Sequence, residues 1–484
     1  MTKSMDVLHI SAECYPAAKI GGLADVVGSL PKYLTQLGIT APVIIPKYHL
    51  PWILDQTYKE MHRGEIQLGY YHQPFIVEKL TSIDLGFPFY VLDLPGKFDR
   101  PGIYADPSGH HYGDEPERNM AFQRAVLAWV RSWKKKPSIL HCHDHHTGLI
   151  PFMIRHSPDY KDLSQIPTVF TIHNGRYHGA FGWDRLHLLP FFDGAARGLI
   201  DWAGVINPLA AAIKSCWRLT TVSNTYLEEL RVDSNGLEWL YHEEARKSVG
   251  ILNGIDYAVW NPATDDRIDF KMKKSVSYFK RENKRPLVEN FNLNKKYPLV
   301  AFIGRFAREK GADLLPDLVY QTLSNNFPLN LLILGSGNTM LHDALNGLKT
   351  LFPNQYNVYI GYNEDLAHQI YAGADFLLMP SRVEPCGLNQ MYALRYGTIP
   401  IVRRTGGLVD SVIDLGDTNG CGIMFNHALV GDILHGFSRA FELFSDKRML
   451  NSIREQNMQL DFSWQRSAET YHRVYRSVLK DIKE

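Results

Sequence analysis

Lys19, Gly21 and Gly22 stand in the run Lys-Ile-Gly-Gly-Leu, shortly after the apolar stretch Val7–Ile10. Glycines carry no Cβ, so the backbone N–H groups of this turn can approach a bound ligand closely. A helix that starts here directs its positive end at that ligand, and the lysine adds a full charge. The spacing fits neither the dinucleotide-binding nor the Walker pattern. The motif predicts a seat for an anionic group, although a lone Gly-Gly turn is also compatible with a plain connection.

A second pair of cations lies far downstream, in the segment Ile303–Gly311. Arg305 leaves an apolar run, and Lys310 follows five residues later near an expected helix start. Arginine holds phosphate oxygens in a fork, whereas lysine acts as a compact point charge. Ordinary surface charge is the alternative, but a strand end that faces a cleft favours ligand binding.

A loop with two prolines, Pro380–Leu388, follows the apolar run Phe376–Met379. The prolines predict a non-helical loop, with a helix beginning near Gly387 whose N–H groups suit a diphosphate. Glu384 is an acceptor suited to sugar hydroxyls. Cys386 is a possible nucleophile, but no adjacent histidine would activate it, so a small buried thiol is the favoured interpretation.

Thr405, Gly406 and Gly407 form another glycine turn after an apolar run, the counterpart of the first motif. Alone, this turn is equally compatible with a tight connection between a strand and a helix.

The run His141–His146 contains four histidines and resembles a metal cluster. In a strand, successive side chains alternate faces, so His141 and His143 share a face that His146 need not share. No second cluster of cysteines or carboxylates completes a zinc pattern. We therefore expect no metal here, and interpret this run and His173 as strand ends beside a polar ligand.

The elements that position these residues are short apolar strands alternating with helical patterns. Alternation of this kind predicts parallel sheets covered on both faces. The pattern restarts near Tyr297, which predicts two doubly wound α/β domains in tandem. The expected strands are Val7–Ser11, Pro42–Pro46, Phe89–Leu94, Ile139–His143, Thr168–His173, Leu299–Gly304, Asn330–Gly335, Asn357–Gly361, Asp375–Met379 and Thr398–Val402, and Asn119–Lys134 is an expected helix.

Two further segments have distinct patterns. Asn261–Lys296 is rich in charge and poor in apolar periodicity, which indicates a solvated helix and linker. Near the end, large aromatics from Phe462 to Leu479 recur at helical spacing, which predicts a helix that packs on another surface, such as the first domain.

Composition limits the function classes. The chain has 484 residues, too many for one core, and its 52 Lys+Arg against 51 Asp+Glu argue against a nucleic-acid or membrane-surface binder. Five scattered cysteines without a Cys-x-x-Cys motif favour a reduced, cytoplasmic setting. Neither a signal peptide nor an apolar run long enough to cross a membrane is expected.

Several motifs together resemble the bacterial glycogen synthases and plant starch synthases. The resemblance runs in order from about Val7 to about Tyr475. The motifs that carry it are Lys19–Leu23, Pro101–Tyr104, Tyr112–Asp114, Ile251–Asp256, Gly304-Arg305 with Lys310-Gly311, Glu384–Leu388 and Thr405–Leu408. The residue eight positions after Glu384 is Tyr392, which favours this branch over sucrose-synthase-like or trehalose-type relatives. Gly175 and Arg176 depart from the family's usual apolar pair.

The resemblance implies a GT-B fold, with two Rossmann-like domains facing across a cleft and a C-terminal helix that crosses back to the first domain. The expected boundaries are 1–250, 251–461 and 462–484. It implies retaining transfer of glucose from ADP-glucose to the non-reducing end of an α-1,4-glucan such as glycogen, without a metal or cofactor. The oligomeric state is left open.

The resemblance also assigns residues by motif position. It implies that Arg305 and Lys310 clamp the diphosphate. Catalytic roles around the transferred glucose are implied for Glu384, His173, Asp144 and Asp25. Donor-binding roles are implied for Lys19, Gly21, Gly22, Asn253, Tyr362 (stacked on the base), Cys386, Gly387, Leu388, Thr405, Gly406 and Gly407.

No carboxylate is signalled as a nucleophile, which favours attack by the acceptor hydroxyl on the face from which the diphosphate leaves. Two alternatives stay open: another GT-B nucleotide-sugar enzyme, such as a UDP-glucose-dependent transferase or an epimerase, and a non-catalytic glucan-binding scaffold. The scaffold would be expected to lack the basic clamp, whereas Arg305, Lys310 and Lys19 are all present.

Overall fold

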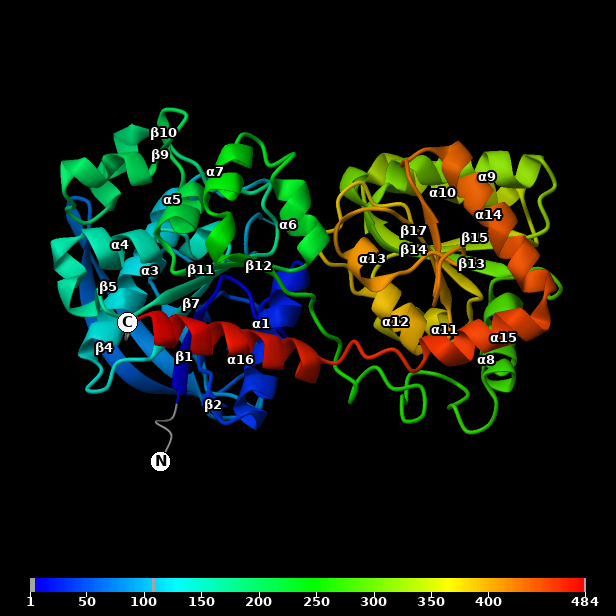
Figure 1. Ribbon diagram of the computed structural model, residues 1–484, viewed down its shortest axis with the longest axis horizontal. Coiled ribbons are helices and arrows are strands. Elements are labelled where there is room, and N and C mark those ends of the chain that lie inside the picture. Colours follow the sequence, from blue (N-terminus) through cyan, green and yellow to red (C-terminus); the bar gives the residue numbers. More distant parts are fainter. Residues whose placement is uncertain (1–4, 107–108, 483–484) are drawn as a thin grey trace. The chain divides into compact units, whose positions relative to one another are not determined.

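The computed structural model describes residues 5–106 and 109–482. The chain forms two compact units. One consists of Met1–Val222, Leu227–Ile251 and Trp464–Glu484, and the other of Ser223–Tyr226 and Leu252–Ser463. We call them unit 1 and unit 2 (Figure 1).

Unit 1 is built on a twisted sheet whose strand order is β12-β11-β8-β7-β1-β3-β6-β5-β4, with β2 beside β1. Pairing is parallel except along β6-β5-β4. The strands are β1 (Met5–Ile10), β2 (Ile39–Thr40), β3 (Val43–Pro46), β4 (Tyr58–Leu68), β5 (Tyr71–Leu80), β6 (Phe89–Asp93), β7 (Ile139–His143), β8 (Thr168–Ile172), β11 (Arg218–Thr221) and β12 (Ser248–Gly250), with a separate pair β9 (Asp201–Trp202) and β10 (Val205–Ile206).

Helices cover this sheet, and the last of them comes from the end of the chain. They are α1 (Gly22–Gln36), α2 (Pro51–Leu54), α3 (Glu115–Ser132), α4 (Ile150–His156), α5 (Pro208–Ser215), α7 (Glu238–Glu243) and α16 (Trp464–Asp481), while α6 (Asn224–Leu230) is divided, with its residues to Tyr226 in unit 2 and those from Leu227 in unit 1. Trp464, Tyr471 and Tyr475 of α16 are buried in one cluster with Val26 and Leu30 of α1. The expected return of the C-terminal helix to the first domain is confirmed, and Figure 1 shows α16 in red beside α1.

Unit 2 contains a parallel sheet in the order β15-β14-β13-β16-β17-β18. Its strands are β13 (Leu299–Phe306), β14 (Asn330–Gly337), β15 (Tyr356–Ile360), β16 (Phe376–Met379), β17 (Ile399–Arg403) and β18 (Ile423–Phe425). Its helices are α8 (Val276–Asn290), α9 (Leu315–Ser324), α10 (Thr339–Leu351), α11 (Glu364–Gly373), α12 (Asn389–Arg395), α13 (Gly406–Ser411), α14 (Val430–Ser445) and α15 (Lys447–Asn457).

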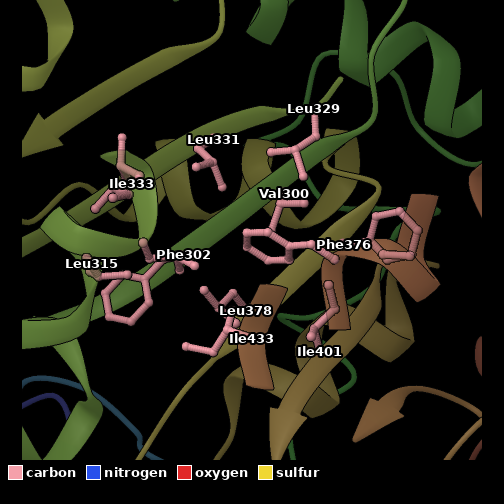
Figure 2. Packing of buried hydrophobic residues seen from close by; sticks show 14 of the residues in the cluster. Val300, Phe302, Leu315, Leu329, Leu331, Ile333, Phe376, Leu378, Ile401 and Ile433 are labelled. Atoms are coloured by element: carbon pink, nitrogen blue, oxygen red, sulfur yellow. The ribbon is translucent and has the colours of Figure 1, made fainter. Parts of the chain in front are cut away.

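The two faces of this sheet carry separate cores, because successive side chains of a strand point to opposite faces. Val300 and Phe302 of β13 pack with Leu315 of α9 on one face, as Figure 2 shows. Leu299 and Ala301 pack on the other face, against α8, α11 and α12. Continuous apolar strands covered on both sides are what the sequence predicts, and the doubly wound α/β class is confirmed.

One expectation about this architecture needs correction. The segment Asn261–Lys296 is not a solvated linker: α8 within it buries Phe279, Leu287 and Val288 in the core of unit 2. The charged residues on the exposed face of α8 outnumber its buried apolar residues, so the helical apolar pattern is weak in the sequence. The helix expected near Gly387 begins at Asn389, and Gly387 in the preceding loop has a left-handed backbone (φ +72°), which glycine adopts readily.

In each sheet the strand order reverses beside the first strand of the unit. In unit 1 this happens between β1 and β7, and in unit 2 between β13 and β16. Ligands of doubly wound sheets bind at such switch points, outside the carboxyl ends of the strands. The residues that follow these four strands are therefore where a site is expected.

Candidate active site

In unit 1, the turn Lys19–Gly22 lies after β1 and leads directly into α1, which begins at Gly22. The Lys19 ammonium lies 2.7 Å from Oδ1 of Asp25, in the first turn of the helix. A Cβ built on Gly21 or Gly22 would meet no atom within 4 Å. Packing within the protein therefore does not require these glycines, and the open space suits close approach of a ligand.

The buried carboxylate of Glu13 holds this turn through hydrogen bonds to its backbone. Its Oε2 accepts hydrogen bonds from the backbone N–H of Ile20 (2.6 Å) and of Gly21 (3.1 Å). Its Oε1 accepts the Tyr104 hydroxyl at 2.7 Å. Burial raises the pKa of the Glu13 carboxyl. The N–H of Gly21 thus serves to hold the turn, and Glu13 is a site residue that sequence reasoning missed; the only signal was a carboxylate just after a strand.

Asp144 follows β7 with an unusual backbone conformation, φ 55° and ψ 176°. This region is almost confined to glycine and costs about 1–3 kcal/mol, so such residues cluster at functional sites. Its Oδ1 accepts the backbone N–H of His173, which follows β8, at 2.7 Å. Burial raises the pKa of the Asp144 carboxyl to about 7. The structure therefore joins Asp144 and His173 at the carboxyl edge of the sheet.

His173 is buried, and burial lowers the pKa of its imidazole to about 3. The ring is therefore neutral near pH 7. Its Nε2 lies 3.0 Å from Nδ1 of His143. A neutral ring at this position can hold a hydrogen bond to a substrate oxygen without adding charge.

Two groups of metal-ligand type occur among the described residues: His9, His141 and His143, and Glu115, His145 and His146. In the first group, His9 and His143 are hydrogen bonded to each other, and both nitrogens of His141 are bonded to Tyr475 and Thr171. In the second, His145 is hydrogen bonded to Glu115 at 3.0 Å. Hydrogen bonds thus occupy some of these ring nitrogens, whereas Nε2 of His9 and Nδ1 of His145 and of His146 are buried without a partner in the described part of the chain.

In unit 2, the basic pair stands at the end of β13. Arg305 forms an ion pair with Glu309, and its side chain is 57% exposed. Lys310 lies 2.8 Å from both carboxylate oxygens of Glu384, which belongs to the loop after β16. The two strands that flank the switch point therefore bring a lysine and a buried glutamate into direct contact.

The Glu384 loop is braced at several points. The Ser381 hydroxyl donates to Glu384 at 2.9 Å. Arg403, at the end of β17, donates to the carbonyl oxygens of Ser381 (2.7 Å) and Arg382 (2.6 Å). The N–H of Arg382 donates to the Glu309 carbonyl at 2.7 Å, which ties this loop to the Arg305–Lys310 turn. Bracing of this kind fixes the Glu384 carboxylate in place.

Gly407 has a role different from that of Gly21. A Cβ on Gly407 would lie 2.1 Å from the Cys386 carbonyl oxygen, so only glycine fits. Its N–H donates to the Glu384 carbonyl at 3.0 Å. Gly407, with Thr405 at the N-cap of α13 and Gly406 at its start, therefore packs the turn after β17 against the Glu384 loop.

Cys386 and Asn253 are neighbours in unit 2. The Cys386 thiol is buried, receives a hydrogen bond from the Asn253 backbone, and has its pKa raised to about 12 by burial. It is a protonated thiol rather than a nucleophile. Oδ1 of Asn253 is buried with no hydrogen-bond partner in the described part of the chain. An orphaned buried acceptor is costly, which marks Asn253 as a residue that a ligand's donor would satisfy.

The remaining predicted residues lie at the same edge of unit 2. Leu388 occupies the position just before α12, and the Asn389 side chain donates to the Ile303 carbonyl at 2.8 Å, which ties the helix to β13. Tyr362 follows β15 with 80% of its surface exposed. Its ring is accessible to a planar base. Tyr362 follows β15, however, and β14 lies between that strand and β13, which carries Arg305.

The family models match the chain in two segments. The starch synthase catalytic domain model covers residues 6–243, and the model of glycosyl transferases group 1 covers residues 283–440. These two segments correspond to the main parts of unit 1 and unit 2.

The curated relatives include a glycogen synthase of Flavobacterium johnsoniae, 47% identical over 98% of this chain and 100% of that protein. A glycogen synthase of Geobacillus stearothermophilus is 37% identical over 98% of each chain. Among solved structures, the catalytic domain of starch synthase IV from Arabidopsis thaliana, bound to ADP and acarbose, matches with a TM-score of 0.87 and 31% identity. It covers 99% of this chain and 100% of that one.

A sucrose-phosphate synthase from Thermosynechococcus elongatus matches with a TM-score of 0.62 at 16% identity, which shows the shared fold alone. The expected GT-B class is confirmed by these neighbours. Near-complete coverage at high identity shows the family: the chain belongs to the glycogen and starch synthases and is a glycosyltransferase.

Proposed function

We propose that this glycosyltransferase moves glucose from ADP-glucose to the non-reducing 4-hydroxyl of an α-1,4-glucan such as glycogen, with retention of configuration. The observation that carries the proposal is the Lys310–Glu384 contact beside Arg305 at the β13/β16 switch point. Two cations at the carboxyl edge suit a nucleoside diphosphate. The ADP and acarbose bound to the starch synthase IV relative support the same substrate classes.

The chemistry is a displacement at the anomeric carbon. The acceptor oxygen forms a bond to that carbon while the bond to the diphosphate oxygen breaks, both on one face, and a phosphate oxygen takes the acceptor's proton. The negative charge that develops on the leaving diphosphate is the main cost. We propose that Arg305 and Lys310 stabilise it, and preorganised charge of this kind is typically the largest catalytic contribution.

We propose further that the reaction needs no metal or cofactor, because hydrogen bonds within the protein already occupy both ring nitrogens of His141 and of His143. Nucleic acids and membranes are not proposed as partners, given the balanced charge. Among the described residues, no helix combines the length and apolarity of a membrane span. A cytoplasmic location is proposed from the five free, buried cysteines.

The experiment is glucose incorporation into glycogen or a maltooligosaccharide by the purified chain, with ADP-glucose and UDP-glucose in parallel arms. We expect primer-dependent incorporation, α-anomeric products by NMR, and preference for ADP-glucose. A further arm contains EDTA, and activity should persist there. Equal or better use of UDP-glucose would refute the donor assignment. Inhibition by EDTA that one divalent ion reverses would refute the metal-free mechanism. No incorporation from either donor would favour an epimerase or a glucan-binding scaffold.

A further inference from the structure

Three buried imidazoles of unit 1 are joined in a chain. His9 lies in β1, His143 ends β7, and His173 follows β8. Nδ1 of His9 lies 3.1 Å from Nε2 of His143, and Nδ1 of His143 lies 3.0 Å from Nε2 of His173. The central ring therefore uses both of its nitrogens in hydrogen bonds to other histidines.

Each ring in this chain is neutral near pH 7. Burial lowers the pKa of His9 and of His173 to about 3, and the pKa of His143 well below its ordinary value. A neutral imidazole has one N–H donor and one acceptor nitrogen. His143 must therefore donate to one neighbour and accept from the other, so both hydrogen bonds run in the same direction and the chain has a polarity.

The two ends decide that polarity. Nε2 of His9 and Nδ1 of His173 are both buried without a hydrogen-bond partner in the described part of the chain. One polarity leaves an orphaned N–H on His9, and the other leaves it on His173. Buried orphan N–H groups are rarer than orphan acceptors because their desolvation is costly. His9 is 0% exposed and His173 is 7% exposed at the carboxyl edge, so the N–H is better tolerated on His173.

We propose that His143, held in turn by His9, is a positioning residue that fixes His173 in the tautomer with its proton on Nδ1. His173 then offers an N–H donor, not a lone pair, to an oxygen of the bound sugar; only this last clause rests on the proposed function. A single fixed tautomer makes the site ready for an acceptor oxygen before substrate binds, which lowers the cost of organising it.

His141 provides a matched control inside the same cluster. It is fully buried and its ring stacks on that of His143, with centroids 4.2 Å apart. Its nitrogens, however, bond to the Tyr475 hydroxyl (2.7 Å) and to Oγ1 of Thr171 (2.6 Å), outside the chain. Loss of His141 perturbs packing to a similar degree without removing a link between His143 and His173.

The direct test is NMR of the full chain labelled with ¹⁵N-histidine, which reports which ring nitrogen carries the proton. The His173 signals are assigned by their loss in His173→Gln. In the unsubstituted protein, we expect the proton on Nδ1 of His173. His143→Leu should move it to Nε2, the ordinary preference of a free neutral imidazole. His143→Asn, whose amide can place an N–H near the former Nδ1, should restore it, and His141→Leu should leave it unchanged.

Kinetics supply a second readout. His143→Leu should lower kcat about tenfold, the size of one lost hydrogen bond, with the KM for glucan almost unchanged. His143→Asn should recover most of that loss. A proton on Nε2 of His173 in the unsubstituted protein overturns the proposal, and this result does not depend on how any variant folds. An unchanged His173 tautomer in a folded His143→Leu also overturns it. The expected tautomers in a protein without transferase activity would support the chain and refute only the proposed function.

Discussion

The ammonium of Lys310 lies 2.8 Å from both carboxylate oxygens of Glu384, although the two residues are 74 positions apart in the chain. Glu384 is almost fully buried, with 6% of its side chain exposed, whereas Lys310 retains 28%. The Ser381 hydroxyl completes the shell of the carboxylate. A buried acid thus fixes the position of a partly accessible cation, at the point where a leaving diphosphate would develop charge.

The first prediction concerns this pair. Lys310→Met and Glu384→Gln should each lower kcat at least about 10²-fold, because roughly 3 kcal/mol of transition-state stabilisation is lost. Lys310→Met should also destabilise the fold by about 3 kcal/mol, since it leaves a buried carboxylate uncompensated. Urea unfolding of both single variants and the double variant gives the coupling free energy.

The double variant should be less destabilised than the sum of the single variants, because it leaves no unpaired charge. Lys295→Met is the matched control, since Lys295 pairs with Glu289 on the surface, and neither activity nor stability should change appreciably. Additive destabilisation would show that the contact does not couple the two residues.

The second prediction is that a substitution of Arg305 lowers activity without the loss of stability expected for Lys310→Met. The ion pair of Arg305 with Glu309 is largely solvent-exposed, so Arg305→Ala should change the free energy of unfolding by less than about 0.5 kcal/mol. The kcat should still fall about 10²-fold, because the guanidinium is proposed to act on the leaving diphosphate. Initial rates and urea unfolding are the measurements. Arg308 is an exposed arginine of the same turn, and the control variant Arg308→Ala should retain activity. If Arg305→Ala turns over within a few fold of the unsubstituted enzyme, Arg305 does not bind the diphosphate.

Sequence patterns predicted the parallel strands well because strands buried on both faces are continuous apolar runs, as in Leu299–Gly304. The antiparallel hairpin of β4 and β5 was not predicted. Most side chains of Tyr58–Leu68 are polar or charged and face solvent, so this strand lacks a continuous apolar run. The site residues at strand ends could be found from motifs. Their partners could not, because contacts such as Glu13 to Tyr104 join segments 91 positions apart through tertiary packing.

Glu13 offers a test of such a partner. Glu13→Leu removes the acceptor of two backbone N–H groups, those of Ile20 and Gly21, and should destabilise the protein by about 2–4 kcal/mol. It should also lower turnover, because the Lys19–Gly22 turn loses its anchor. Glu13→Gln keeps one acceptor oxygen and should cost much less in both respects. Thermal unfolding and initial rates measure these effects, with the exposed Glu60→Gln as control. If Glu13→Gln is as damaging as Glu13→Leu, the carboxylate has a role beyond holding the turn.

The last prediction concerns pH and Asp144. Burial raises the pKa of its carboxyl from 3.8 to about 7, so the folded state retains a proton that the unfolded chain has already released. Between these two values, ionisation costs more in the folded state, and the stability contributed by this group falls as pH rises. The stability contributed by Asp144 is fully present below about pH 4 and is lost as pH rises through about 7. At 1.36 kcal/mol per unit, the total is about 4 kcal/mol.

Asp144→Asn cannot ionise, its amide oxygen can still accept the His173 N–H, and asparagine tolerates a positive φ better than most residues. The free energy of unfolding of the unsubstituted protein, measured relative to Asp144→Asn, should therefore decline between pH 4 and pH 8. Urea unfolding at intervals across that range measures this difference and cancels the contributions of titratable groups that do not interact with Asp144. A flat difference would place the Asp144 pKa near its ordinary value, and a rising one would show that the fold favours the carboxylate, as expected if a cation neutralised it.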